Sequence, residues 1–242
     1  MARLRRLYVP ELPAAGGGVD LPRESLEHVH VLRLAAGALV ELFDAQGRKT
    51  VAELTEVSRA RAVCEAQPPS AAMTRTGGLQ LIVCLPKAGK LETIVRMTTE
   101  LGVRALHLAQ SERSVPKGAE SAKLERLRRV AREACAQSGQ PLVPELHAPS
   151  TLAECVARAA KDAHKLLFWE QASAALPAAM SGEVWAVIGP EGGLSVEEAE
   201  MLQASGYAPI SLGSHILRAE TACVVITALL VDRMQLLRAA DS

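Results

Sequence analysis

The order of apolar and polar residues divides the chain into two regions of different character. Residues 38–57 alternate in part between apolar and polar on both sides of Gly47, which predicts a β-hairpin with a glycine in its turn. Residues 60–65 predict a further strand. Several short strands in a small amino-terminal unit indicate a compact β-barrel. Residues 66–78 then shift to proline, alanine and glycine, and we interpret them as a linker.

After the linker, segments with a strand pattern alternate with segments that have helical spacing. The expected strands are residues 79–85, 103–109, 165–170, 184–188 and 209–212. The expected helices are residues 91–101, 121–137, 152–160, 195–206 and 221–236. Strands that alternate with helices imply a mainly parallel sheet. We therefore predict an α/β fold, with a small β-rich domain in residues 1–70 and a larger α/β domain in residues 71–242.

The last expected helix is apolar around most of its circumference. Val224, Val225, Ile226, Leu229 and Leu230 cannot all face one core, so such a helix must be buried on several sides. A subunit interface would bury it in this way. The alternative is a helix enclosed within a single chain.

Composition restricts the classes of function. Lys+Arg and Asp+Glu are both 27, so binding to nucleic acid has to use a local basic patch. The five cysteines are odd in number and widely spaced, and they predict buried thiols in a reducing cytoplasm, with no metal site. The basic amino terminus has no apolar segment of the signal-peptide kind. The longest apolar run, residues 222–231, is too short to span a bilayer.

Two glycine turns follow expected strands near the carboxyl terminus. The first is Gly189-Pro190-Glu191-Gly192-Gly193, and a helix with a capping box, Ser195 with Glu198, comes next. The second is Leu212-Gly213. Ligands of open parallel sheets bind beyond the carboxyl ends of strands, where glycine allows close approach of the backbone. Ordinary βα loops are the alternative. Neither G-x-G-x-x-G nor the P-loop motif is present, so a cofactor bound through its phosphates is not indicated.

The two turns and their flanks resemble a known family. Ile188-Gly-Pro-Glu-Gly-Gly-Leu-Ser195, then Leu212-Gly213 and Ile216-Leu-Arg-x-Glu-Thr-Ala222, are similar to the RsmE-type ribosomal RNA (uracil-N3)-methyltransferases of the SPOUT class. The resemblance extends over nearly the whole chain, through Lys90-Leu-Glu92, Thr99-Glu-Leu-Gly-Val103 and Ser111-Glu-Arg-Ser114. Residues 27–33 resemble the family's PUA-like domain. The chain departs from the family pattern at Ser214-His215, Ala219 and Gln140.

The resemblance implies a fold, a reaction and partners. It implies a SPOUT-type parallel sheet with a carboxyl-terminal trefoil knot and a small PUA-like barrel that binds RNA. It also implies that S-adenosylmethionine methylates N3 of a uridine in 16S ribosomal RNA on the small subunit, and that the protein is a homodimer. Two alternatives remain open. One is a SPOUT enzyme that modifies another base or a ribose hydroxyl, and the other is an RNA-binding assembly protein without catalysis.

The resemblance and the spacing together suggest three sets of site residues. The expected cofactor-binding residues are Phe168, Trp169, Glu170, Gly189, Glu191, Gly192, Leu212, Gly213 and Leu217. The catalytic candidates are Arg218, Glu220, Glu100 and Arg113. The RNA-binding candidates are Arg3, Arg5, Arg6, Arg33, Arg126, Arg129 and Arg132. The alternatives are core packing for Trp169, a structural salt bridge for Arg218 with Glu220, and solvated surface charge for the arginines.

Overall fold

The computed structural model describes residues 4–73, 77–87, 89–114 and 121–236. The chain forms two compact units. The first comprises residues 1–74 and 131–143, and the second comprises residues 75–130 and 144–242. The sequence had divided the chain after residue 70 and had not assigned residues 131–143 to the first unit.

The first unit is built on a five-stranded sheet in the order β1-β3-β4-β5-β2. Its elements are β1 (Arg5–Tyr8), β2 (Gly17–Asp20), α1 (Arg23–Val31), β3 (Leu39–Phe43), β4 (Lys49–Val57) and β5 (Ala62–Ala66). β3 and β4 form the expected antiparallel hairpin, and β5 pairs with β4. Alternating residues of these strands, among them Val40, Leu42 and Leu54, are fully buried in one apolar core. The sequence patterns did not predict β1, β2 or α1.

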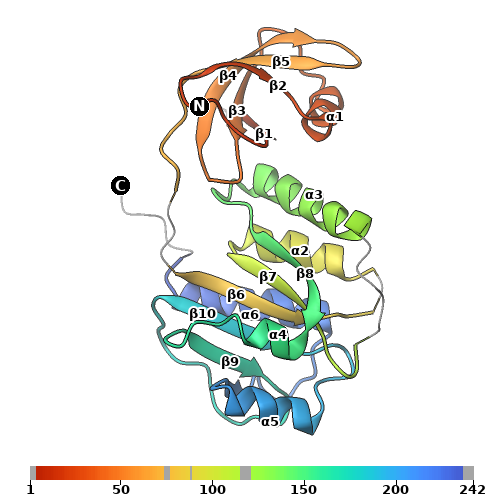
Figure 1. Cartoon of the computed structure of the whole chain (residues 1–242), viewed down its shortest axis with the longest axis vertical. Helices are drawn as coiled ribbons and strands as arrows, with labels where there is room; N and C mark the ends of the chain where they lie inside the picture. The colour runs from red at the N-terminus through yellow and green to blue at the C-terminus, as the bar shows by residue number, and fades with distance from the viewer. Residues whose placement is uncertain (1–3, 74–76, 88, 115–120, 237–242) are drawn as a thin grey trace. The chain divides into compact units, whose positions relative to one another are not determined.

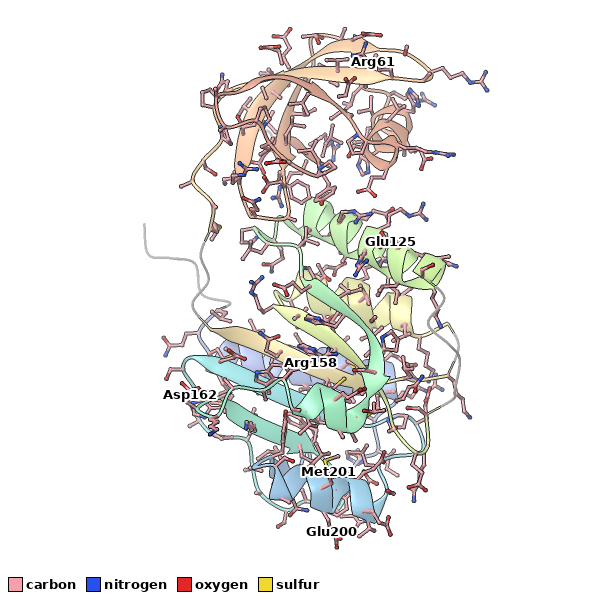
Figure 2. All side chains as sticks on the ribbon, viewed as in Figure 1. Arg61, Glu125, Arg158, Asp162, Glu200 and Met201 are labelled. Atoms are coloured by element: carbon pink, nitrogen blue, oxygen red, sulfur yellow. The ribbon has the colours of Figure 1, made fainter. Side chains whose placement is uncertain are left out.

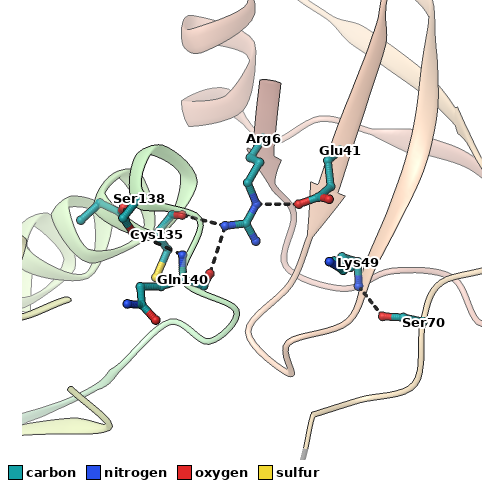
Figure 3. Close-up of polar contacts among 8 residues, drawn as sticks. Arg6, Glu41, Lys49, Ser70, Cys135, Ser138 and Gln140 are labelled. Carbon is teal, nitrogen blue, oxygen red and sulfur yellow. Dashed lines mark hydrogen bonds and ion pairs between the residues drawn. The ribbon is translucent and has the colours of Figure 1, made fainter. Parts of the chain in front are cut away.

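Arg6 joins the sheet of this unit to residues 131–143 (Figure 3). Its Nε donates to Glu41 Oε1 at 2.6 Å, and its Nη1 donates to the carbonyl oxygens of Cys135 and Gln140 at 2.8 and 3.0 Å. The side chain is 6% exposed. The prediction that Arg6 contacts RNA phosphates was therefore wrong, because the buried guanidinium is used within the protein.

The second unit is built on a six-stranded sheet in the order β11-β9-β10-β6-β7-β8, in which every pairing is parallel. The strands are β6 (Gly78–Cys84), β7 (Ala105–Gln110), β8 (Glu145–Thr151), β9 (His164–Phe168), β10 (Glu183–Ile188) and β11 (Ala208–Ile210). The predicted α/β fold with a parallel sheet is confirmed. All expected strands are present, and β8 is an additional edge strand.

Helices cover both faces of this sheet (Figure 1). α2 (Leu91–Glu100) and α6 (Ala219–Arg233) pack together on one face. α4 (Leu152–Val156) and α5 (Val196–Ala204) pack on the other face, around a core that includes Ile82, Val187 and Tyr207. α3 (Ser121–Ser138) begins in this unit and ends in the first. The described helices include none that is long and apolar enough to cross a membrane. All five cysteines lie in described parts of the chain, where they are buried and form no disulfide bond.

A stack of rings lies on the sheet near the loop that follows α4. His107 and His147 are stacked with their centroids 4.3 Å apart, and His107 also contacts Trp185 at 4.5 Å. His107 Nε2 is 3.2 Å from Gln80 Oε1, and its Nδ1 is 3.4 Å from Nη1 of Arg158, which Figure 2 labels beside α4. Burial first, and then the neighbouring His147 and Arg158, lower the pKa of His107 to about 3. His107 is therefore neutral in the folded protein.

The first prediction concerns Arg6. Arg6→Met should lower the free energy of unfolding by about 2–3 kcal/mol, because it leaves the Glu41 carboxylate and two carbonyl oxygens without their donor. Arg5→Met is the matched control, since Arg5 is exposed on the same strand and should change stability by about 0.5 kcal/mol or less. Urea unfolding at pH 7 measures both. Equal stability of the two variants would contradict the structural role of Arg6.

The second prediction concerns His107. Between pH 6.5 and about 3 the unfolded chain binds a proton at this residue that the folded chain does not, so stability is lost as the pH falls. From pH 7 to pH 5 this loss is about 2 kcal/mol. Urea unfolding at pH 7 and pH 5 measures the free energy of unfolding of wild type and of His107→Gln. Between these pH values wild type should lose about 2 kcal/mol more than the variant. If the free energies of unfolding of the two proteins changed with pH in parallel, His107 would bind its proton in the folded chain as readily as in the unfolded chain.

Candidate active site

A cavity of about 490 Å³ lies at the carboxyl edge of the six-stranded sheet. It forms where β9, β10 and β11 end side by side, since Ile188 pairs with Phe168 and Phe168 pairs with Ile210. It is lined by residues of three loops and of the start of α6, namely Phe168–Glu170, Ile188–Leu194, Ile210, Leu212–Leu217, Ala219, Ala222 and Ile226. Of these lining residues none is Lys or Arg, and the ionisable ones are Glu170, Glu191 and His215.

The first glycine turn is held in place by its backbone and by α5. Gly193 has φ +70° and donates its N–H to the carbonyl oxygen of Pro190 at 2.9 Å. A side chain at Gly193 would come within 2.9 Å of Glu170 Oε1. Ser195 and Glu198 form the expected capping box at the start of α5, and this fixes where the turn ends. The turn thus presents its backbone to the cavity with no side chain at the point of closest approach.

The second glycine turn brings apolar side chains to the mouth of the cavity. Gly213 has φ +105°, and its N–H donates to Ser211 Oγ at 3.1 Å. The loop then continues through Ile216, which is 94% exposed, and Leu217, which is 36% exposed. Both residues line the cavity. An almost fully exposed isoleucine beside a cavity is suited to contact a flat apolar surface such as a nucleobase.

Lys90, which the sequence motifs do not assign to the site, joins two carboxylates at this edge. Lys90 Nζ lies 3.0 Å from Glu191 Oε1 and 2.9 Å from Glu220 Oε2. Hydrogen bonds from Lys90 lower the pKa of Glu220. Burial alone would raise the pKa of Glu191, but hydrogen bonds from Lys90 and from backbone N–H groups outweigh burial and lower it. Both carboxyl groups are therefore ionised at neutral pH.

Arg113 covers the outer side of the first glycine turn. Its Nη1 donates to the carbonyl oxygen of Gly192 at 2.9 Å. A Cβ added at Gly192 would lie 3.3 Å from the Cβ of Arg113, so a side chain there would crowd the arginine. The neighbouring Glu112 donates its N–H to Glu198 at 2.8 Å. The loop after β7 is therefore tied to both the turn and α5.

The structure gathers most of the predicted residues at this edge. All nine expected cofactor-binding residues line the one cavity. Arg218 is the residue before α6, between Leu217 and Ala219, and its carbonyl oxygen accepts the N–H of Ala222 at 2.8 Å. Its side chain makes no capping hydrogen bond at the start of α6, and its charge acts on the nearby Glu220. The salt bridge considered between Arg218 and Glu220 is not formed, because Glu220 pairs with Lys90.

Glu100 is not at this edge. It is the last residue of α2, which begins after Lys90 and runs back to the start of β7. The helix therefore separates Glu100 from Lys90 by about 15 Å at 1.5 Å per residue. The prediction that Glu100 shares the sheet edge with Arg218 was wrong, because α2 carries the chain from the carboxyl edge to the amino edge.

The RNA-binding candidates differ in exposure and in partners. Arg5 and Arg33 are exposed, whereas Arg3 lies outside the described residues. Arg126 is exposed and pairs with Glu92 at 2.8 Å. Arg129 is exposed and has a contact within the protein. Arg132 donates two hydrogen bonds to Glu24, each 2.7 Å long, and lies over the Tyr8 ring. The guanidinium of Arg132 is therefore paired with Glu24 within the protein.

Sequence reasoning missed Lys90 and several lining residues. The missed lining residues are Ile188, Pro190, Gly193, Leu194, Ile210, Ser214, His215, Ile216, Ala219, Ala222 and Ile226. Lys90 carried one usable signal, since it directly precedes a helix that follows a parallel strand and so starts at the carboxyl edge.

A second cavity, of about 570 Å³, lies at the opposite edge of the same sheet. Its lining includes Gly78 and His164, which begin β6 and β9, together with residues 179–182 and 234–236. The described residues of its lining include no Asp or Glu, and it lies at the amino ends of the strands. We therefore assign the candidate site to the cavity at the carboxyl edge. Among the described residues, no group of three His, Cys, Asp or Glu side chains could hold a metal ion.

Comparison with known proteins agrees with this assignment. Residues 75–231 match the model of the RNA methyltransferase domain family. The ribosomal RNA small subunit methyltransferase E of Synechocystis is 34% identical over 155 residues, which are 61% of this chain and 51% of that protein. The chain therefore spans about half the length of that relative. The Bacillus subtilis protein of the same name is 29% identical over 237 residues, covering 89% of this chain and 90% of its own.

The solved structures that are similar to this chain include a methyltransferase with a bound ligand. The crystal structure of a ribosomal RNA small subunit methyltransferase E from Neisseria gonorrhoeae, bound to S-adenosyl methionine, superposes with a TM-score of 0.87. It is 28% identical and covers 96% of this chain and 98% of its own. The resemblance that the sequence motifs carried, to RsmE-type methyltransferases, is confirmed.

Proposed function

The chain belongs to the RNA methyltransferase domain family, and from this premise we propose that it methylates N3 of a uridine in 16S ribosomal RNA with S-adenosylmethionine. One observation carries the proposal. The nine residues that the motifs assigned to the cofactor, although spread from Phe168 to Leu217, line a single cavity. The names of the relatives support methylation of small-subunit ribosomal RNA, and the Neisseria gonorrhoeae structure supports the cofactor. The choice of uridine N3 rests on the resemblance that the sequence motifs carry.

The cavity residues fit S-adenosylmethionine. Gly193 and Gly213, both with positive φ, leave room for a ligand beside the backbone. The indole Nε1 of Trp169 is a buried donor with no acceptor among the described residues, at the wall of the cavity. The charged lining residues Glu170 and Glu191 are acidic, which suits a cationic sulfonium and not a phosphate. When bound, the cofactor supplies an electrophilic methyl group.

The chain's own residues then have to remove the N3 proton and stabilise the charge that develops. Arg218 is exposed beside the cavity, and its guanidinium stays protonated at working pH, so it suits a uracil oxygen that becomes negative. Glu220 is ionised and lies in the first turn of α6, so it suits acceptance of the N3 proton. Arg113 holds the Gly192 carbonyl and keeps the first glycine turn in position. Alignment of the reacting atoms is the main demand of this reaction.

The wider architecture follows the same family. The second unit carries the trefoil knot of the SPOUT class, and residues 1–70 form a PUA-like barrel that binds the RNA. Arg5, Arg33, Arg126 and Arg129 contact phosphates, which would position the RNA without reading its sequence. The protein acts in the cytoplasm on the small ribosomal subunit.

The exposed face of α6 supports a homodimer. Val225, Ala228 and Leu229 lie on the side of the helix away from the buried Cys223 and Ile226. Leu229 is 36% exposed, and Met97 of α2 is 39% exposed. An apolar face of this kind is buried by a second copy of the chain. Sedimentation equilibrium should give twice the chain mass, and Leu229→Glu should give a monomer.

The proposed reaction is tested on ribosomal RNA itself. Mass spectrometry of small-subunit rRNA nucleosides from a strain that lacks the gene should show the loss of N3-methyluridine. Persistence of this nucleoside would contradict the proposal. Loss of a different methylated nucleoside would indicate another RNA methyltransferase. Absence of S-adenosylhomocysteine binding by the folded protein, measured by calorimetry, would indicate an RNA-binding protein without catalysis.

The third prediction concerns the glycines of the cavity. Gly213→Val places a β-branched residue at φ +105°, and Gly192→Val forces the Arg113 side chain away. Both variants should remain folded and lose S-adenosylhomocysteine binding in calorimetry. Gly182→Val is the matched control, because Gly182 has φ +79° and lies in the same unit at the other sheet edge. Retained binding in both cavity variants would remove these glycines from the site.

The fourth prediction concerns Arg218. Arg218→Ala should lower kcat by ~10²–10³, the usual effect of losing one donor to a developing oxyanion. Arg218→Lys keeps the charge but loses the fork of donors, so its kcat should lie between those of Arg218→Ala and wild type. A rise in pH should partly restore the kcat of both variants, since uracil then loses its proton more readily. Cofactor affinity should be unchanged. Dissociation or unfolding of Arg218→Ala would instead identify a structural residue.

A further inference from the structure

Lys90 lies where three loops of the carboxyl edge meet. It directly precedes α2, whereas Glu191 belongs to the first glycine turn and Glu220 to the first turn of α6. The ammonium is 3.0 Å from one carboxylate and 2.9 Å from the other. A single side chain therefore connects the turn that follows β10 to the helix that follows the second glycine turn.

The surroundings make these two contacts stronger than pairs on an open surface. The side chains of Lys90, Glu191 and Glu220 are 28%, 21% and 24% exposed, so each is partly shielded from water and keeps some contact with it. Both oxygens of Glu191 also lie 3.2 Å from the backbone N–H of Lys87. The Glu191 carboxylate is thus held from two directions by the same loop.

The protonation states agree with this geometry. Hydrogen bonds to Glu220 and Glu191 raise the pKa of Lys90, so its ammonium persists above the usual pH range. The positive charge of Arg218 also lowers the pKa of Glu220, but by less than the hydrogen bond from Lys90 does. Of the three residues only Glu191 lines the cavity, so Lys90 acts on the cavity through Glu191 and on the start of α6 through Glu220.

We infer that Lys90 is a positioning residue, which fixes the Glu191 carboxylate at the cofactor turn and the Glu220 carboxylate at the start of α6 in one arrangement. This inference rests on the proposed function. In the reaction the methyl group passes from sulfur to N3, the electron pair of the broken S–C bond stays on sulfur, and the N3 proton passes to Glu220. The ammonium keeps Glu220 ionised before the transfer and assists release of the proton to solvent afterwards.

Removal of the ammonium should therefore affect binding and turnover together. Lys90→Met keeps the aliphatic stem, but it leaves two half-buried carboxylates without the cation between them. S-adenosylhomocysteine should bind about tenfold more weakly, and kcat should fall about tenfold, each equivalent to 1.4 kcal/mol. The acidic limb of the kcat profile should move to higher pH, because the pKa of Glu220 rises when its partner is lost. Lys90→Arg should restore most of both quantities.

The experiment combines calorimetry with S-adenosylhomocysteine and steady-state methylation of small-subunit rRNA, each from pH 5 to 9, on the full chain. Arg104→Met is the matched control. Arg104 is 29% exposed and pairs with Glu145 at 3.2 Å, but it lies at the amino edge of the same sheet. This control should bind and turn over like wild type. Lys90→Gln replaces the methionine variant if that variant does not fold.

Each outcome decides the inference. Wild-type binding and an unshifted pH profile in the Lys90 variants would overturn it while the proposed function stands. Equal losses in Lys90→Met and Arg104→Met would overturn it too, since the loss would then not be specific to Lys90 and its two carboxylate partners. If wild type binds S-adenosylhomocysteine but methylates no RNA, the proposed function fails, and the calorimetric difference between Lys90→Met and Arg104→Met alone decides the inference.

Discussion

The common direction of the six strands in the second sheet is the constraint on which the site depends. Because all pairings are parallel, every loop that follows a strand emerges at the same edge. Residues that are far apart in the chain, such as Lys90, Arg113, Glu191 and Glu220, meet there for this reason alone. The sheet also requires helices on both faces, and the return path of α2 takes Glu100 away from the site.

At this edge the backbone and the charged side chains have separate tasks. The glycine turns provide the space and the close approach of the backbone that a ligand needs, and their positive φ values at Gly193 and Gly213 are the physical reason for glycine. The ion pairs of Lys90 connect the first glycine turn to the start of α6, the helix that follows the second glycine turn. A site built in this way depends on backbone shape for binding and on a few half-buried charges for its internal order.

The sequence was informative where the signal was local. Continuous apolar runs and capping residues predicted the buried strands and α5, and the glycine motifs identified the cavity lining. β8 was missed because it is an edge strand with Pro149 and mostly polar residues, which gives no apolar run. The burial of Arg6 and the pairing of Lys90 with Glu220 depend on contacts over more than a hundred residues. Composition and spacing carry no signal for such contacts.

A crystal structure of the chain with S-adenosylhomocysteine tests the central claim most directly. The account predicts the cofactor product between the turns at Gly189–Gly193 and Leu212–Leu217, with Lys90 still bridging Glu191 and Glu220. The position of the sulfur should leave an open path toward Arg218 and Glu220 for a uracil ring. Occupancy of the other cavity instead, beside Gly78 and Met180 at the amino edge, would contradict the account.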